Sequence, residues 1–112
     1  MKLVKAYIRI LMVDDVIHAL EKIKISNISV IDIREMGRNI DKNNFRYSME
    51  YTTAYTPMVK IEIVCRDEEV FNIVSVIKEN AHTGRKGDGL IFISPVEDAI
   101  HIRTGEKGEK FL

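Results

Sequence analysis

The segment Lys2–Ile10, KLVKAYIRI, places apolar side chains at every second position. Side chains of a β-strand point alternately to the two faces of a sheet, so this period of two predicts a strand. One face would carry Val4, Ala6, Ile8 and Ile10, and the other Leu3, Lys5, Tyr7 and Arg9. Alternation and β-branched content predict three further strands at Ile28–Arg34, Met58–Cys65 and Leu90–Ser94.

Apolar residues spaced by three and four predict two helices between these strands. The first begins at Asp14 or Asp15, either of which can cap it, and ends near Lys24. The second begins after Asp67 as its cap and ends near His82.

The order strand, helix, strand, strand, helix, strand is that of the ferredoxin-like βαββαβ fold. In this α+β fold, two helices cover one face of a four-stranded antiparallel sheet. The open face would carry Leu3, Tyr7 and either Ile61 and Ile63 or their alternates. Open sheet faces favour association, so oligomerisation is expected. A short extended piece is predicted at residues 99–103, before a tail, residues 105–112, that is expected to be mobile.

Length and composition exclude several classes of protein. The 112 residues fit a single domain, residues 1–112. The 17 Lys and Arg balance 17 Asp and Glu, whereas nucleic-acid-binding proteins carry a basic excess. No apolar run approaches the roughly 18 residues of a membrane span, and the first residues do not form an export signal. A cytoplasmic protein is expected, with no nucleic acid as partner and no direct membrane insertion.

A glycine-rich loop, Thr83–Gly89, precedes the last strand and contains Arg85 and Lys86. Glycines let backbone N–H groups approach a ligand, and cations beside them favour phosphate. The spacing matches neither of the common nucleotide-binding loops, so a plain tight turn is the alternative. His101 and Arg103 would share a face of the extended piece and could join this loop; otherwise each is a solvated edge residue.

Neither a metal site nor a catalytic group is predicted. The histidines His18, His82 and His101 have no second His, Cys or acidic residue at a ligand spacing. Cys65, the single cysteine, lies in an apolar run and is expected to be buried. No serine has the sequence context of an activated nucleophile.

Residues 37–57 have no sustained period and are too many for an ordinary hairpin turn. This polar segment concentrates aromatic and sulfur-bearing side chains: Phe45, Tyr47, Met49, Tyr51 and Tyr55. Such a composition is typical of protein-binding surfaces, so a partner-binding loop is expected. The alternative is that the rings pack back onto the sheet.

The sequence resembles the P-II nitrogen-regulatory signal-transduction family from end to end. The strongest match is TGRKGDGLIFI at residues 83–93, against the family pattern Thr-Gly-x-x-Gly-Asp-Gly-Lys-Ile-Phe-Val. Supporting matches lie at residues 14–16, 37–38, 50–51, 59–64 and 102–106. The resemblance implies a homotrimer that binds an adenine nucleotide, ATP or ADP, in a cleft between neighbouring subunits.

The resemblance also implies roles for single residues. Phosphates would lie on Gly87, Asp88 and Gly89, with Gly37, Arg38 and Arg103 contributing, and the base would pack near Ser29 and Val64. Residues 37–57 would be the T-loop, which enters or covers targets such as ammonium transporters and nitrogen-assimilation enzymes. Tyr51 would occupy the position that is uridylylated in some members.

Five positions depart from the family pattern. Leu90 replaces a Lys and His101 an Arg, which removes two phosphate-facing charges at neutral pH and predicts weaker triphosphate binding. Asn39 and Met58 replace the Gln and Lys that serve magnesium and 2-oxoglutarate in the family, and Asp41 replaces a Gly. The usual binding of magnesium and 2-oxoglutarate is therefore not expected.

Three hypotheses about function follow. The first is a non-catalytic regulator whose nucleotide biases the conformation of the long loop, with Arg38 coupling the two. The second is a diverged relative with altered or lost effector binding that acts by constitutive protein contact. The third is an enzyme that transfers or hydrolyses phosphate, with Asp88 and His101 as its candidate residues.

Overall fold

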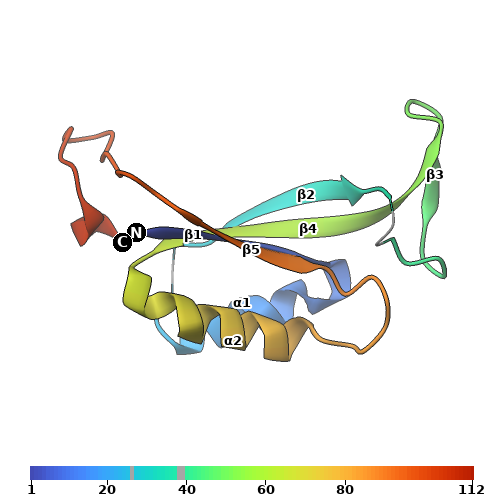
Figure 1. Cartoon of the computed structure of the whole chain (residues 1–112), viewed down its shortest axis with the longest axis horizontal. Helices are drawn as coiled ribbons and strands as arrows, with labels where there is room; N and C mark the ends of the chain where they lie inside the picture. Colours follow the sequence, from blue (N-terminus) through green and yellow to red (C-terminus); the bar gives the residue numbers. More distant parts are fainter. Residues whose placement is uncertain (26, 38–39) are drawn as a thin grey trace.

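Two α-helices pack against one face of an antiparallel sheet in the computed structural model, which describes residues 1–25, 27–37 and 40–112 (Figure 1). The strands are β1 (Lys2–Arg9), β2 (Ser29–Glu35), β3 (Arg46–Ser48), β4 (Thr53–Cys65) and β5 (Leu90–Pro95). The α-helices are α1 (Val13–Lys22) and α2 (Val70–Ala81), and short 3-10 helices cover Ile10–Met12, Asp67–Glu69 and Glu109–Phe111. Arg38 and Asn39, two predicted site residues, lie outside the described residues.

The sheet has the strand order β2-β4-β1-β5, and all of these neighbours are antiparallel. β1 is central, with Ala6 opposite Ile61 of β4 on one side and Ile91 of β5 on the other. β3 lies off this path and pairs with β4. The strand order and the two helices confirm the predicted ferredoxin-like α+β fold.

The core lies between the sheet and the two helices. Val4, Ala6 and Ile8 of β1 are at most 2% exposed, as the period of two predicts. They belong to one buried cluster with side chains from the other elements, including Ile61, Ile63, Val16, Leu20, Ile73 and Ile77. Full burial of a large aliphatic side chain contributes about 1.5–3 kcal/mol, so this cluster is a main source of stability.

The structure also decides which residues face away from the helices. Ile61 and Ile63 face the core, and the open face carries their alternates Lys60, Glu62 and Val64, opposite Tyr7, Lys5 and Leu3. The prediction that Ile10 shares the face of Val4, Ala6 and Ile8 is wrong, because the strand ends at Arg9 and the chain turns into a 3-10 helix that leaves Ile10 half exposed.

Both predicted helix caps are wrong. Asp14 and Asp15 lie in the first turn of α1, whose N-cap is Met12, and they favour the helix through its dipole instead. Ahead of α2, the Glu69 carboxylate accepts the backbone N–H of Arg66 at 3.0 Å. Asp67 pairs with the N-terminal amine at 3.1 Å.

Much of the long loop is a β-hairpin. β4 begins at Thr53, five residues before the predicted Met58, and pairs with β3 through Tyr47 opposite Ala54. The hairpin, residues 46–55, stands out from one end of the sheet and is called the arm below (Figure 1). The period-two pattern fails here because this part of the chain has no buried face to select apolar residues at alternate positions.

The predicted extended piece at residues 99–103 is not a strand. Ile100 forms an isolated bridge with Lys107, and the chain turns between them. The turn is closed by the Gly105 N–H, which donates to the His101 carbonyl at 2.7 Å, and Gly105 has a φ of +74° that suits glycine. His101 and Arg103 therefore do not share a strand face. The mobility of residues 105–112 stays a prediction.

Candidate functional site

The glycine-rich loop joins α2 to β5, and Asp88 holds it closed. Its carboxylate accepts the backbone N–H of Thr83 at 2.8 Å and of Gly84 at 2.9 Å, and the Thr83 hydroxyl also donates to it. Gly89 is required for its close approach to β1, because a Cβ there would lie 1.7 Å from the Tyr7 carbonyl oxygen. The loop is thus a fixed turn whose Asp88 side chain points inward to the protein.

Arg9, at the end of β1, is a functional candidate that the sequence pattern missed. Its buried guanidinium donates to Asp88 at 3.0 Å, to Asp41 at 2.7 Å and to the Lys86 carbonyl at 2.9 Å. These partners belong to the glycine-rich loop and to the root of the long loop. The alternation in β1 placed Arg9 on the open face, and no local pattern indicates partners 32 and 79 residues away.

Both carboxylates of this cluster are ionised at neutral pH. The hydrogen bond from Arg9, followed by that from the Asn43 backbone, lowers the pKa of Asp41. Burial acts to raise the pKa of Asp88, but the hydrogen bonds from Thr83, Arg9 and Gly84 outweigh it and hold the pKa well below its ordinary value. Asp88 is therefore a structural anion, poorly suited to proton transfer near pH 7.

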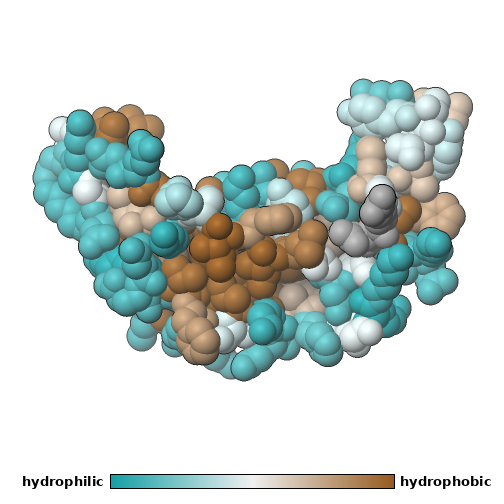
Figure 2. All heavy atoms as spheres, in the orientation of Figure 1, coloured by the Kyte–Doolittle hydropathy of each residue, from teal (hydrophilic) through white to brown (hydrophobic). Residues whose placement is uncertain are grey.

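A cavity of about 480 Å³ lies beside the loop, between the end of β1, the start of β5 and the C-terminal part of α2. Its wall is mainly apolar, with Ile8, Ile77 and Ile91, and carries polar groups from Lys78, Glu79 and His82. Figure 2 shows apolar side chains gathered across the centre of this side of the molecule, over β5 and toward α2. Such a wall suits an apolar ring or a neighbouring protein surface better than a phosphate.

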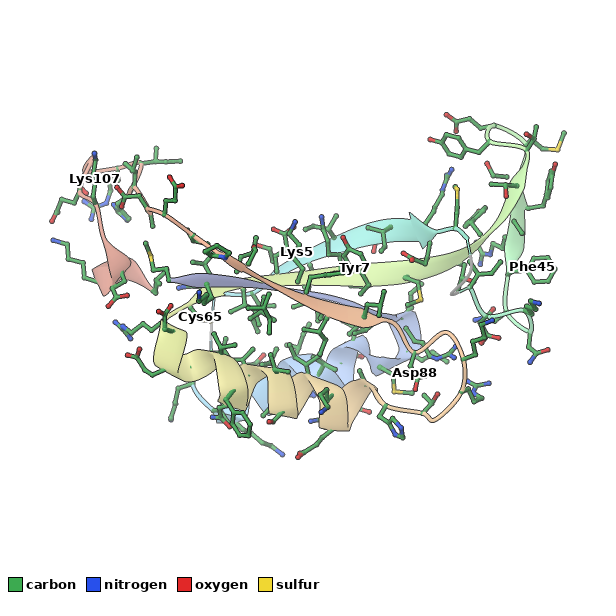
Figure 3. The ribbon with its side chains drawn as sticks, viewed as in Figure 1. Lys5, Tyr7, Phe45, Cys65, Asp88 and Lys107 are labelled. Atoms are coloured by element: carbon green, nitrogen blue, oxygen red, sulfur yellow. The ribbon has the colours of Figure 1, made fainter. Side chains whose placement is uncertain are left out.

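The predicted site residues fall at two ends of the sheet. Gly37, Gly87, Asp88, Gly89 and Leu90 lie where β2 ends and β5 begins, whereas His101 and Arg103 lie beyond the other end of β5. Figure 3 labels Asp88 at the first end and Lys107, in the C-terminal turn, at the second. β5 alone spans about 20 Å, at roughly 3.3 Å per residue.

Ser29 and Val64 belong nearer to the second end. Ser29 begins β2 opposite Glu62, and Val64 pairs with Leu3 near the start of β1. One chain therefore does not bring all of the predicted nucleotide-binding residues together. It also separates Asp88 from His101, the two residues considered for an enzyme.

The arm, together with Phe45 just before it, displays aromatic side chains. Phe45, Tyr47 and Tyr51 are each more than half exposed and Met49 is 82% exposed, so these side chains do not pack back onto the sheet. Tyr55 differs, because its ring lies under the Arg34 guanidinium at 5.2 Å.

Neither α1 nor α2, nor any other helix in the described part of the chain, has the length and apolar content needed to cross a membrane. Within residues 1–25, 27–37 and 40–112, no three His, Cys, Asp or Glu side chains come together as metal ligands would.

Fold and site together define a class: a small ferredoxin-like α+β domain with a glycine-rich loop, an exposed edge strand and a projecting aromatic arm. The sequence profile described as "Nitrogen regulatory protein P-II" matches residues 1–106. Proteins of that name from Azospirillum brasilense and Rhodobacter capsulatus are each 41% identical to this chain, over 108 and 109 residues. The match covers 96% of both chains for the first protein and 97% for the second. A third, from Pasteurella multocida, is 39% identical over 97% of both chains. The chain belongs to the nitrogen regulatory protein P-II family.

Proposed function

We propose that this chain is a nitrogen-regulatory signal-transduction protein that binds an adenine nucleotide between subunits of a homotrimer and controls a target protein through residues 37–57. The single observation that carries the proposal is the separation of the predicted site residues along β5. The glycine-rich loop lies at one end of the strand, and His101 and Arg103 lie at the other. A second subunit can bring a copy of His101 and Arg103 to this loop, as the family resemblance implies.

The surface of the sheet supports association. β5 is the last strand of the sheet, and its Leu90, Phe92 and Ile93 side chains are 44–50% exposed. Edge strands with exposed apolar side chains are commonly covered by another chain. On the open face, the ring of Phe92 packs edge-on against Tyr7 with centroids 5.6 Å apart, which gives a subunit contact an ordered aromatic surface.

The ligand preference follows from the side chains at the loop. Leu90 offers no charge to a terminal phosphate, so a diphosphate loses less binding free energy here than a triphosphate. Met58 is 3% exposed, packed at the position where the family uses a Lys for 2-oxoglutarate. Binding of ADP in preference to ATP, without 2-oxoglutarate, is therefore proposed.

A second function is favoured by one observation, the ion pair between Arg9 and Asp41 at 2.7 Å, which holds the root of the long loop through the protein's own side chains. In that function the arm makes a constitutive contact with its target. The target in either case would meet the exposed Phe45, Tyr47, Met49 and Tyr51 side chains, with Tyr51 open to modification.

Calorimetric titration of the purified protein with ATP, ADP and AMP, each with and without magnesium and 2-oxoglutarate, tests the proposal. Light scattering on the same sample gives the mass of the assembly. One nucleotide per chain in a trimer supports the first function. A protein that gives no heat with any of the three nucleotides supports the second, and a monomer contradicts the first.

A further inference from the structure

The guanidinium of Arg9 joins two loops that are remote in the sequence. Asp41 belongs to the root of the long loop, and Asp88 and Lys86 belong to the glycine-rich loop. The Arg9 and Asp41 side chains are 8% and 6% exposed, and that of Asp88 is 23% exposed. A buried guanidinium shared by two carboxylates fixes both in position, because moving either one leaves a charge without its partner.

The two loops are also in direct contact. A Cβ at Gly87 would lie 2.9 Å from the Cβ of Asp41 and 3.2 Å from Nη2 of Arg9. The backbone of the glycine-rich loop thus lies against Asp41 with no room for a side chain. Asp41 is itself ordered by the Asn43 N–H, which donates to its other carboxylate oxygen at 2.9 Å. Gly87 therefore lies in direct contact with the ordered residues 41–43.

We propose that Arg9 and Asp41 form a latch that couples the two loops: closed, it holds the long loop against Gly87, and an anion bound on the glycine-rich loop opens it. Arg9 is a positioning residue in this device, acting on the ligand through Asp41 and Asp88. The direction follows from charge, because the Asp41 carboxylate beside Gly87 repels a phosphate there and the phosphate competes for Arg9. The inference rests on the proposed binding of nucleotide phosphates at Gly87–Gly89.

The latch makes a reciprocal prediction. If bound phosphate weakens the contact of Asp41 with Arg9, then removal of the Asp41 charge must strengthen phosphate binding by the same coupling factor. A merely structural Asp41 would have the opposite effect, because its loss would loosen the loop and weaken the ligand. The sign of the change in affinity therefore separates coupling from support.

The test is the variant Asp41→Asn, which keeps the size of the side chain and an oxygen for the Asn43 N–H. Asp32→Asn is the matched control, because Asp32 is an exposed carboxylate on β2 outside the cluster. ADP is titrated into each protein by calorimetry, and amide hydrogen exchange is followed over residues 42–48 and 84–88 with and without ADP.

The latch predicts that Asp41→Asn binds ADP about fivefold more tightly, the lower end of usual coupling factors, while Asp32→Asn matches the wild type. It also predicts faster exchange in both segments of Asp41→Asn without ADP, and faster exchange over residues 42–48 of the wild type when ADP is added. Unchanged or weaker ADP binding by Asp41→Asn overturns the latch. A change in the exchange of ligand-free Asp41→Asn that is confined to residues 42–48 also overturns it.

Failure of the proposed function would give a different result. A wild-type protein that binds no ADP contradicts nucleotide binding, and the latch is then decided by the exchange of the two ligand-free proteins. Faster exchange in both segments of Asp41→Asn supports a latch, and faster exchange in one segment alone overturns it.

Discussion

Replacing Arg9 by methionine should destabilise the protein by about 3 kcal/mol. The substitution keeps an unbranched apolar stem and removes the charge of the side chain and its hydrogen bonds to Asp41, Asp88 and the Lys86 carbonyl. Removing one partner of a buried ion pair costs about 3–5 kcal/mol, because it leaves the opposite charge without compensation.

The lower end of that range applies here. Asp88 keeps the hydrogen bonds from Thr83 and Gly84, and its side chain is 23% exposed, so water compensates part of its charge. For a chain of this length, a loss of about 3 kcal/mol lowers the melting temperature by roughly 12 °C. The comparison must hold protein concentration fixed, because the stability of an oligomer depends on it.

The assay is thermal unfolding followed by circular dichroism, with urea titration to obtain the free energy of unfolding. Arg46→Met is the matched control, because Arg46 is exposed on β3 of the arm, and its loss should change stability by less than about 0.5 kcal/mol. Equal stability losses in the two variants would refute the structural role given to Arg9.

Three further predictions concern the same loop, the acid groups and the core. Gly89→Ala should destabilise the protein far more than Gly84→Ala in thermal melts. Both glycines have a positive φ, but a Cβ at residue 89 would lie 1.7 Å from the Tyr7 carbonyl oxygen, whereas a Cβ at residue 84 would lie 3.7 Å from His82. Similar melting temperatures of the two variants would contradict the close approach of Gly89 to β1. The lowered pKa values of Asp41 and Asp88 mean that their stabilisation is complete above the ordinary carboxyl value of 3.8 and is lost as the pH falls below it. The urea midpoint of the wild type should therefore drop at the acid end, and less steeply in Asp41→Asn; parallel curves for the two proteins would count against this assignment. Cys65 is 2% exposed, and burial raises the pKa of its thiol. A disulfide reagent at pH 8 should therefore react slowly with the native protein and rapidly with the protein in denaturant. Rapid labelling of the native protein would show that the thiol is accessible.

Most of the fold could be predicted because its signal is local. The alternation in β1 and the spacing of three and four in α1 and α2 arise from one buried face per element, and each pattern is complete within about ten residues. The arm was missed because Arg46–Ser48 and the first residues of β4 pair with each other without a buried face. Residues 99–103 were misassigned because a bridge and a turn at Gly105 replace a strand there.

The site could be predicted only in part, for a related reason. The glycine-rich loop has a local pattern, and Gly89 is needed where it was expected. Within one chain the Asp88 carboxylate accepts hydrogen bonds from Thr83, Gly84 and Arg9, which no local pattern indicates, and its place beside a phosphate stays a prediction. Arg9 and Asp41 meet only in three dimensions, and the strand period alone assigned Arg9 to the wrong surroundings.

The central claim, a ligand site completed by two chains, is tested most directly by subunit mixing. One variant carries Arg85→Glu and Lys86→Glu in the glycine-rich loop, and the other carries Arg103→Glu; all three side chains are exposed, so the fold should be kept. Each variant alone should fail to bind ADP. The two variants are unfolded, mixed in equal amounts and refolded together. In random trimers, roughly a quarter of the sites then combine an intact loop with an intact Arg103. ADP binding should therefore return to about a quarter of the sites. No recovery in mixed trimers of confirmed mass would contradict a shared site.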